Sequence, residues 1–149
     1  MAGCGLLVSC GPQSIMMPND GMNPTIGVGD QVSGNFMTYD KKDPELGDVV
    51  IFRPFGHPGR RWVLRVAGVP GDHIGYSGGV LRRNGQLVVS PGFQDGRSYP
   101  PMKSGGPQIG TLRAGEYFLL SDDPAYTNDS RVWGPVRRTE IMAKVTSHR

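Results

Sequence analysis

The side chains that could bind a metal or act as nucleophiles are few and scattered in this sequence. The three histidines are His57, His73 and His148, without the spacing of a ligand set, and both cysteines, Cys4 and Cys10, fall near the start. A structural metal site usually needs four closely placed ligands. We therefore predict no bound metal and no cofactor, and look for chemistry among serine, lysine and carboxylate side chains.

The segment 21–30, which reads GMNPTIGVGD, is tightly specified in its backbone. Gly21, Pro24, Gly27 and Gly29 surround a few apolar side chains, a composition typical of a tight, exposed turn. Three further segments define a pattern with it: LGDVVIF at 46–52, LRVAGVPGD at 64–72 and DSRVWGPV at 129–136.

In order and approximate spacing, these four segments resemble the type I signal peptidase family. NGQLV at 84–88 and AGEYFLLSDD at 114–123 are similar to its connecting strands, so the resemblance covers residues 15–146. The pairing of PGD with a later DSRxWG is the most specific part. The resemblance implies a serine endopeptidase family that removes signal peptides from exported proteins with a Ser-Lys dyad, on a β-sheet fold shared with LexA-type repressors.

The family's nucleophile opens an S-M-x-P-T motif. Met22, Pro24 and Thr25 match this motif, but Gly21 stands at the serine. A serine hydroxyl is a weak nucleophile that needs an adjacent base, and glycine offers no hydroxyl at all. The resemblance therefore implies that the nucleophile is absent.

The family's base is a lysine directly before the arginine of K-R-x-x-G-x-P-G-D. Arg65 matches that arginine, but Leu64 stands at the lysine. A buried lysine can act as a base once its pKa falls, whereas leucine has no lone pair. We therefore expect that neither catalytic residue of the dyad is intact, at Gly21 or at Leu64.

Neighbouring side chains are poor substitutes for the dyad. Ser14 and Ser33 lie too far along the chain from Gly21, and Thr25 cannot be assumed to present its oxygen at the same spot. Arg65 stays protonated in proteins and cannot act as a general base. We expect no rescued active site.

The third motif is altered as well. Where the family reads G-D-N-R, this chain has Ser121, Asp122, Asp123 and Pro124. An aspartate and arginine two residues apart can hold a loop against strands by a charge-assisted bond, so a scaffold role is favoured. The residues of this supporting loop are Ser121, Asp122, Thr127, Asp129, Ser130 and Arg131.

A peptide groove could persist without chemistry. Gly21 keeps a backbone N–H of the kind that stabilises an oxyanion in acyl transfer. The resemblance implies that substrate binds as an added strand through main-chain hydrogen bonds. The candidate groove residues are Gly21, Met22, Pro24, Thr25 and Arg65.

Composition favours an all-β domain. The chain has 149 residues with 23 glycines and 13 prolines, and short apolar runs recur between turn residues. Strands are predicted within 47–54, 60–72, 115–123 and 140–147, with a hairpin over 79–89 turning at Asn84-Gly85. Residues 90–110 predict a long surface excursion or hairpin tip. The expected fold is the signal-peptidase or LexA-like sheet, barrel-like in topology, with an extended insertion.

The formal charge is +3, and the basic residues are dispersed as pairs rather than clustered with aromatics. This argues against nucleic-acid binding and leaves a membrane surface as a possible partner. The remaining partner is an extended peptide or signal-peptide segment. The expected location is the bacterial cell envelope, at the outer face of the inner membrane or in the periplasm.

We interpret residues 1–14 as a flexible tail and 15–149 as the signal-peptidase-like domain. Leu7 to Cys10 resembles a lipobox, with Cys10 as the lipidated residue, but no basic residue precedes it. Three functions follow: an inactive homologue that binds extended peptides near the membrane, an active signal peptidase, or a structural lipoprotein domain. The first is favoured because scaffold motifs are kept around Gly21 and Leu64.

Overall fold

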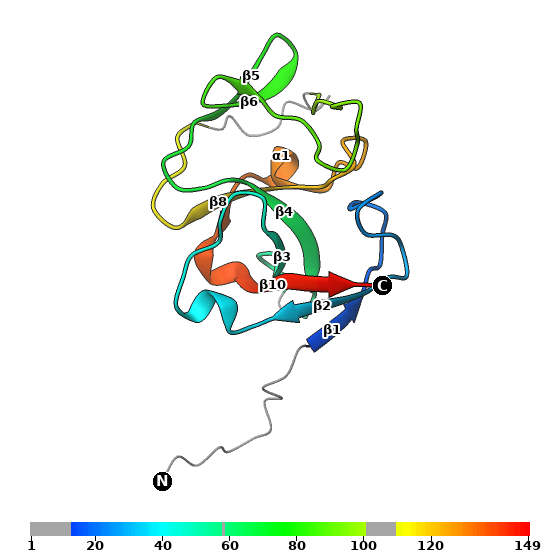
Figure 1. Ribbon diagram of the computed structural model, residues 1–149. Coiled ribbons are helices and arrows are strands. Elements are labelled where there is room, and N and C mark those ends of the chain that lie inside the picture. The colour runs from blue at the N-terminus through cyan, green and yellow to red at the C-terminus, as the bar shows by residue number, and fades with distance from the viewer. Residues whose placement is uncertain (1–12, 58, 101–109) are drawn as a thin grey trace.

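The computed structural model describes residues 13–57, 59–100 and 110–149 of the chain. The described residues fold into two antiparallel sheets joined by turns and loops, so the all-β prediction is confirmed (Figure 1). The larger sheet has the order β1-β2-β10-β3-β4-β8-β9. Its strands are β1 (Gln13–Met16), β2 (Gln31–Asn35), β3 (Val49–Phe52), β4 (Trp62–Gly68), β8 (Glu116–Leu120), β9 (Val136–Arg137) and β10 (Ile141–His148).

The smaller sheet is inserted between β4 and β8. It has the order β5-β6-β7, with β5 (Ile74–Ser77), β6 (Val80–Arg83) and β7 (Gln86–Leu87). Asn84 and Gly85 join β6 to β7 with φ of 49° and 78°, as a type I′ turn requires. The predicted hairpin is therefore confirmed.

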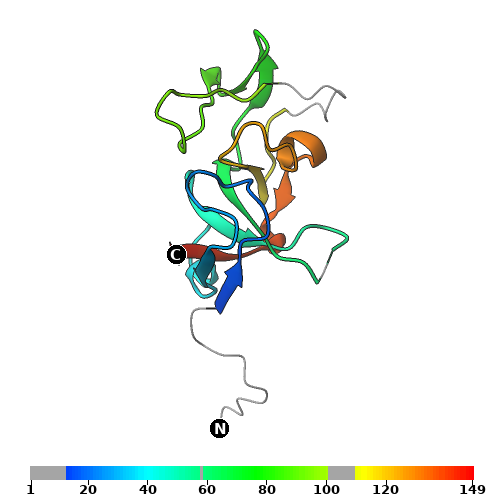
Figure 2. The same ribbon diagram turned by 90° about the vertical axis from the view of Figure 1, so that its right-hand side faces the viewer.

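The larger sheet is strongly curled. Arg61, just before β4, donates from Nη1 to Oε1 of Gln13 in β1 over 3.2 Å, although these strands are not neighbours in the sheet. The smaller sheet lies at the opposite end of the molecule from β1 (Figure 1), and the connection between β3 and β4 projects to one side (Figure 2).

Helical structure in the described residues is limited to single turns. These are α1 (Ser130–Trp133) and two 3₁₀ turns, Thr38–Asp40 and Arg138–Glu140. Asp129 caps α1 by accepting a hydrogen bond from the Arg131 N–H.

Two apolar clusters form the core. The larger lies within the curled sheet and includes Phe52, Leu64 and Leu119, and the smaller, with Ile74 and Phe118, joins the two sheets. Tyr99 belongs to the smaller cluster and is 1% exposed.

Of residues 90–110, 101–109 lie outside the described residues. Val89 and Ser98 form an antiparallel bridge, and the Ser90 N–H donates to the Arg97 carbonyl over 2.7 Å, so the described part includes a hairpin tip, the second form predicted. The prediction of a surface position is wrong at Tyr99, whose ring is buried in the smaller cluster.

Asp72 fixes the corner where the chain leaves β4 for the smaller sheet. Its carboxylate accepts hydrogen bonds from the Val69 N–H at 2.9 Å, from Arg83 Nε at 2.6 Å and from Asn84 Nδ2 at 3.0 Å. Burial opposes ionisation of this carboxyl, but the bonds from Arg83 and the Val69 N–H outweigh it and hold its pKa below the ordinary value.

Replacing Asp72 with asparagine tests this corner. A lowered pKa means that the carboxylate stabilises the fold above its unfolded pKa of about 3.9, and that this is lost as pH falls through the folded pKa. At pH 7 we expect Asp72→Asn to lower the free energy of unfolding by about 1–3 kcal/mol.

The deficit of Asp72→Asn should shrink when urea denaturation is repeated near pH 3. Asp43→Asn, at an exposed carboxylate, serves as the control and should change stability little at either pH. A deficit for Asp72→Asn that is equal at both pH values would contradict this role.

Candidate functional site

The turn at residues 21–26 is anchored by apolar side chains that point into the core. Met22 and Ile26 are buried, and the Ile26 N–H donates to the Met22 carbonyl over 2.8 Å. Pro24 is exposed at the top of the turn, after a cis peptide bond. The turn therefore directs Met22 inward and leaves Pro24 outside.

Asp122 connects this turn to β4. Thr25 Oγ1 donates to Asp122 Oδ2 over 2.6 Å. Arg65 makes a two-pronged contact with the same carboxylate, from Nε to Oδ1 and from Nη2 to Oδ2, both over 2.7 Å. The structure thus brings together two of the predicted groove residues, Thr25 and Arg65, with Asp122 of the predicted loop.

The Arg65 guanidinium is committed to this structural pair. Its hydrogen bond to Asp122 raises the pKa of the arginine, and its Nη1 donates to the Gly47 carbonyl over 2.9 Å. Arg65 also lines a cavity of about 320 Å³ between the two sheets. The guanidinium is always protonated, so Arg65 donates hydrogen bonds and cannot accept a proton.

Removal of the Asp122 carboxylate should be among the most damaging changes at this site. Asp122 is fully buried, and Asp122→Ala would leave Arg65 without its counter-charge and Thr25 without its acceptor. We expect a loss of about 3 kcal/mol in unfolding free energy, measured by urea denaturation.

Asp95→Ala is the matched control, because Asp95 pairs with Arg97 over 3.1 Å on the surface. Exposed pairs of this kind contribute about 0–1 kcal/mol. Asp122→Asn, which keeps the side chain's volume and one acceptor, should fall between the two. Equal losses for Asp122→Ala and Asp95→Ala would contradict the assigned role.

Gly21 does not present a free backbone donor. Its N–H donates to the side-chain oxygen of Asn19 over 3.0 Å, and its carbonyl accepts from the Asp123 N–H over 3.1 Å. The backbone N–H proposed from the sequence for an oxyanion is therefore engaged by the carboxamide two residues earlier.

Leu64 lies in the apolar core. It is 3% exposed and pairs with Val50 of β3 in the sheet register. Side chains alternate between the faces of a strand, so Leu64 and its neighbour Arg65 point to opposite faces of β4. The surroundings of Leu64 are those of a packing residue.

Arg131 holds the loop between β8 and α1 in place. It is 1% exposed and makes a two-pronged contact with Asp129, with Nε to Oδ1 and Nη2 to Oδ2 both 2.9 Å. It also donates to the carbonyls of Pro124 and Tyr126, over 3.0 Å and 2.6 Å. Ser121 Oγ lies 2.9 Å from Asp129 Oδ2. This buried network sets the path of the loop.

The other two loop residues do different things. Ser130 is buried, and its Oγ accepts a hydrogen bond from the Leu119 N–H over 2.9 Å. Thr127 is exposed on the outside of the loop. Ser130 thus ties α1 to β8, whereas Thr127 faces solvent.

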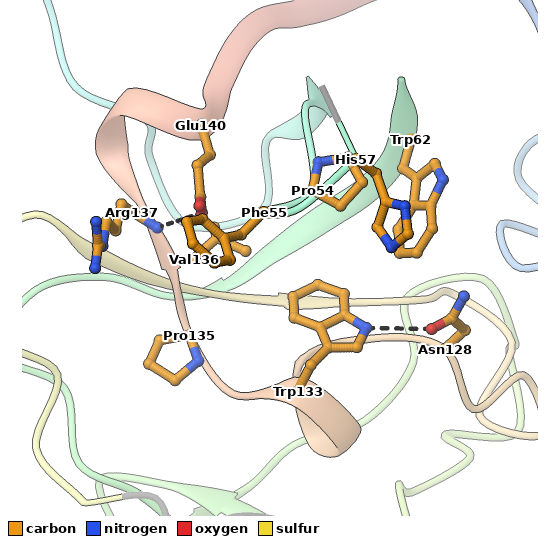
Figure 3. A pocket seen from close by; sticks show the side chains of 10 residues that line it. All are labelled: Pro54, Phe55, His57, Trp62, Asn128, Trp133, Pro135, Val136, Arg137 and Glu140. Atoms are coloured by element: carbon orange, nitrogen blue, oxygen red, sulfur yellow. Dashed lines mark hydrogen bonds between the residues drawn. The ribbon is translucent and has the colours of Figure 1, made fainter. Parts of the chain in front are cut away.

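An aromatic pocket of about 460 Å³ lies where the β3–β4 connection meets the segment after α1 (Figure 3). His57 stacks on Trp62, and Trp133 Nε1 donates to Asn128 Oδ1 over 3.2 Å. None of its residues is a serine, threonine, cysteine or lysine, so it holds no nucleophile of the predicted kind. Its lining is Pro54, Phe55, His57, Trp62, Asn128, Trp133, Pro135, Val136, Arg137 and Glu140.

Two residues that contact the site were not among the predicted site residues, Asn19 and Ser90. Asn19 shows a signal, because asparagine commonly accepts a hydrogen bond from the backbone two residues on. Ser90, whose Oγ donates to the Asp122 carbonyl, lies in a segment with no recognisable pattern. Cys10 and the proposed lipobox lie outside the described residues.

Comparison with known proteins agrees with this architecture. The family model described as "Signal peptidase, peptidase S26" matches residues 5–148. A "Probable signal peptidase I-1" of Synechocystis is 28% identical over 133 residues, covering 85% of this chain and 65% of the relative. "Signal peptidase IB" of Staphylococcus aureus is 27% identical over 139 residues, covering 85% of this chain and 72% of the relative.

A solved structure shows the same fold. The crystal structure of a signal peptidase I from Enterococcus faecalis matches with a TM-score of 0.50 and 24% identity, covering 70% of this chain and 98% of that chain. Together with the family model, these matches confirm the resemblance, and the chain belongs to the signal peptidase family. The chain spans 65% of the length of the Synechocystis relative. Within the described residues, no helix is long and apolar enough to cross a membrane.

Proposed function

We propose that this chain is a non-catalytic member of the signal peptidase family that binds extended segments of exported proteins. The observation that carries the proposal is the pairing of Gly21 and Leu64 with a kept scaffold. Leu64 packs in the core, and the Gly21 N–H is already bonded to Asn19. The position that the resemblance assigns to the nucleophile thus carries a turn residue, and the position that it assigns to the base carries a core residue.

A strand edge supports the proposed peptide binding. Among residues 13–57, 59–100 and 110–149, β1 pairs only with β2 and forms one edge of the larger sheet. Gln31, the register partner of Met16, exchanges its backbone hydrogen bonds with Arg149 on the other side, over 2.7 Å and 3.0 Å. The N–H and C=O of Met16 therefore point away from β2, and an added strand can bond to them.

The proposed setting follows from the family. A protein that handles export signals works in the cell envelope beside a membrane, and dispersed basic residues would favour anionic headgroups. The proposed partners are a signal-peptide segment and the membrane surface, with no nucleic acid.

The first test is catalytic. The purified chain, incubated with a synthetic signal peptide and followed by mass spectrometry, should give no specific product above a protein-free blank. "Signal peptidase IB" of Staphylococcus aureus is the positive control. Site-specific cleavage with turnover would overturn the non-catalytic assignment and favour an active signal peptidase.

The second test addresses the strand edge. Met16→Pro removes an outward-pointing N–H, whereas Met16→Ala keeps it, and the Met16 side chain is 73% exposed. We expect Met16→Pro to weaken binding of a fluorescent signal peptide roughly five- to tenfold in an anisotropy titration. Met16→Ala should bind as the unaltered chain does. Equal affinities for all three would rule out binding along β1.

A further inference from the structure

The ring of Tyr126 lies against Gly21. A Cβ atom built on Gly21 would be 2.8 Å from both Cδ1 and Cε1 of Tyr126, and 3.1 Å from the side-chain oxygen of Asn19. Both carbon contacts are closer than real Cβ atoms approach. The backbone itself does not require glycine, because Gly21 is not among the residues with positive φ. Space, rather than conformation, limits the side chain at this position.

Tyr126 is held by its own backbone bonds rather than resting loosely on the turn. Its N–H donates to the Asp123 carbonyl over 3.0 Å, and its carbonyl accepts from the buried Arg131 over 2.6 Å. The Asp123 N–H in turn donates to the Gly21 carbonyl over 3.1 Å. The loop that carries the ring is thus bonded directly to the turn that the ring covers.

We propose that Tyr126 and Asn19 together close the position of Gly21. Asn19 occupies the backbone N–H, and Tyr126 fills the space into which a side chain would extend. The position is therefore closed by two contacts in addition to lacking a hydroxyl. Both contacts close the position of Gly21 whether or not the chain binds peptides.

One consequence is that Gly21→Ser with Leu64→Lys should not suffice to create a Ser-Lys site. A serine at this position would have to displace the Tyr126 ring before its hydroxyl could face a substrate. A third substitution that replaces Tyr126 with a smaller residue would also be needed, because the ring limits which side chain fits at residue 21.

A double-mutant cycle tests the packing directly. Where space allows, glycine-to-alanine changes stabilise a protein by restricting its unfolded chain. Gly21→Ala should therefore lower the urea midpoint when Tyr126 is present, because of the overlap, and should lower it much less in a Tyr126→Ala background, where the 3.1 Å contact with Asn19 remains. The difference between the two shifts is the readout.

Gly59→Ala is the matched control, because a Cβ there meets no atom within 4 Å and its φ is not positive. It should shift the midpoint equally in both backgrounds. Equal shifts for Gly21→Ala in the two backgrounds would overturn the proposal.

Thiol labelling measures the closure itself. In a chain with Cys4 and Cys10 replaced by serine, Gly21→Cys should react with a small thiol reagent about tenfold more slowly than Gly59→Cys. Tyr126→Ala should remove most of that difference. Rapid labelling of Gly21→Cys with Tyr126 in place would show that the ring does not close the position.

If Tyr126→Ala does not fold, the contact can be measured in the unaltered chain by nuclear magnetic resonance. Nuclear Overhauser contacts between the Gly21 α-protons and the Tyr126 ring protons are expected from the geometry. Their absence from a well-resolved spectrum of the folded chain would overturn the inference without any variant.

Discussion

The buried carboxylate of Asp122 is the interaction on which the arrangement of the site depends. It lies between Arg65 of β4 and Thr25 of the 21–26 turn, and its residue's carbonyl accepts from Ser90. A buried charge is strongly unfavourable unless it is paired and hydrogen-bonded. Strand β4 and the 21–26 turn therefore have to assemble around one carboxylate, and Ser90 joins the segment after the smaller sheet to the backbone carbonyl of the same residue.

The contacts around Asp122 give the family's motif residues a structural role that does not depend on catalysis. Thr25 and Arg65 each donate to Asp122, and Asp129 and Arg131 bond to each other and to the loop backbone. None of these contacts needs a residue at 21 or 64 that can exchange a proton. Motif residues that suggest an enzyme in the sequence thus also specify a turn, a loop and their attachment to the sheet.

The sequence predicted the elements whose signal is local and failed where pairing partners are distant. β3, β4 and β8 fall inside predicted apolar runs, β10 extends one residue past the predicted 140–147, and Asn84-Gly85 specifies the turn of its hairpin. β1 and β2 were not predicted, because their short polar sequences, QSIM and QVSGN, become strands only by pairing with each other and with β10.

The site shows the same division. The motifs located Gly21 and Leu64, but no pattern could show that Tyr126, more than a hundred residues from Gly21 in the chain, would lie against it. That contact arises from the tertiary path of a loop set by Arg131. Tertiary contacts of this kind carry no periodicity that a single sequence displays.

The packing around Gly21 suits the residue that is present. The Tyr126 ring and the Asn19 carboxamide occupy the space into which a side chain at this position would extend. Leu64 is 3% exposed within a cluster of apolar side chains. Apolar burial would hold a lysine at this position neutral, as a Ser-Lys dyad requires, so the surroundings of Leu64 do not by themselves oppose a base there. The contacts that oppose the dyad are those of Gly21 with Tyr126 and Asn19, and they fit the non-catalytic state that we propose.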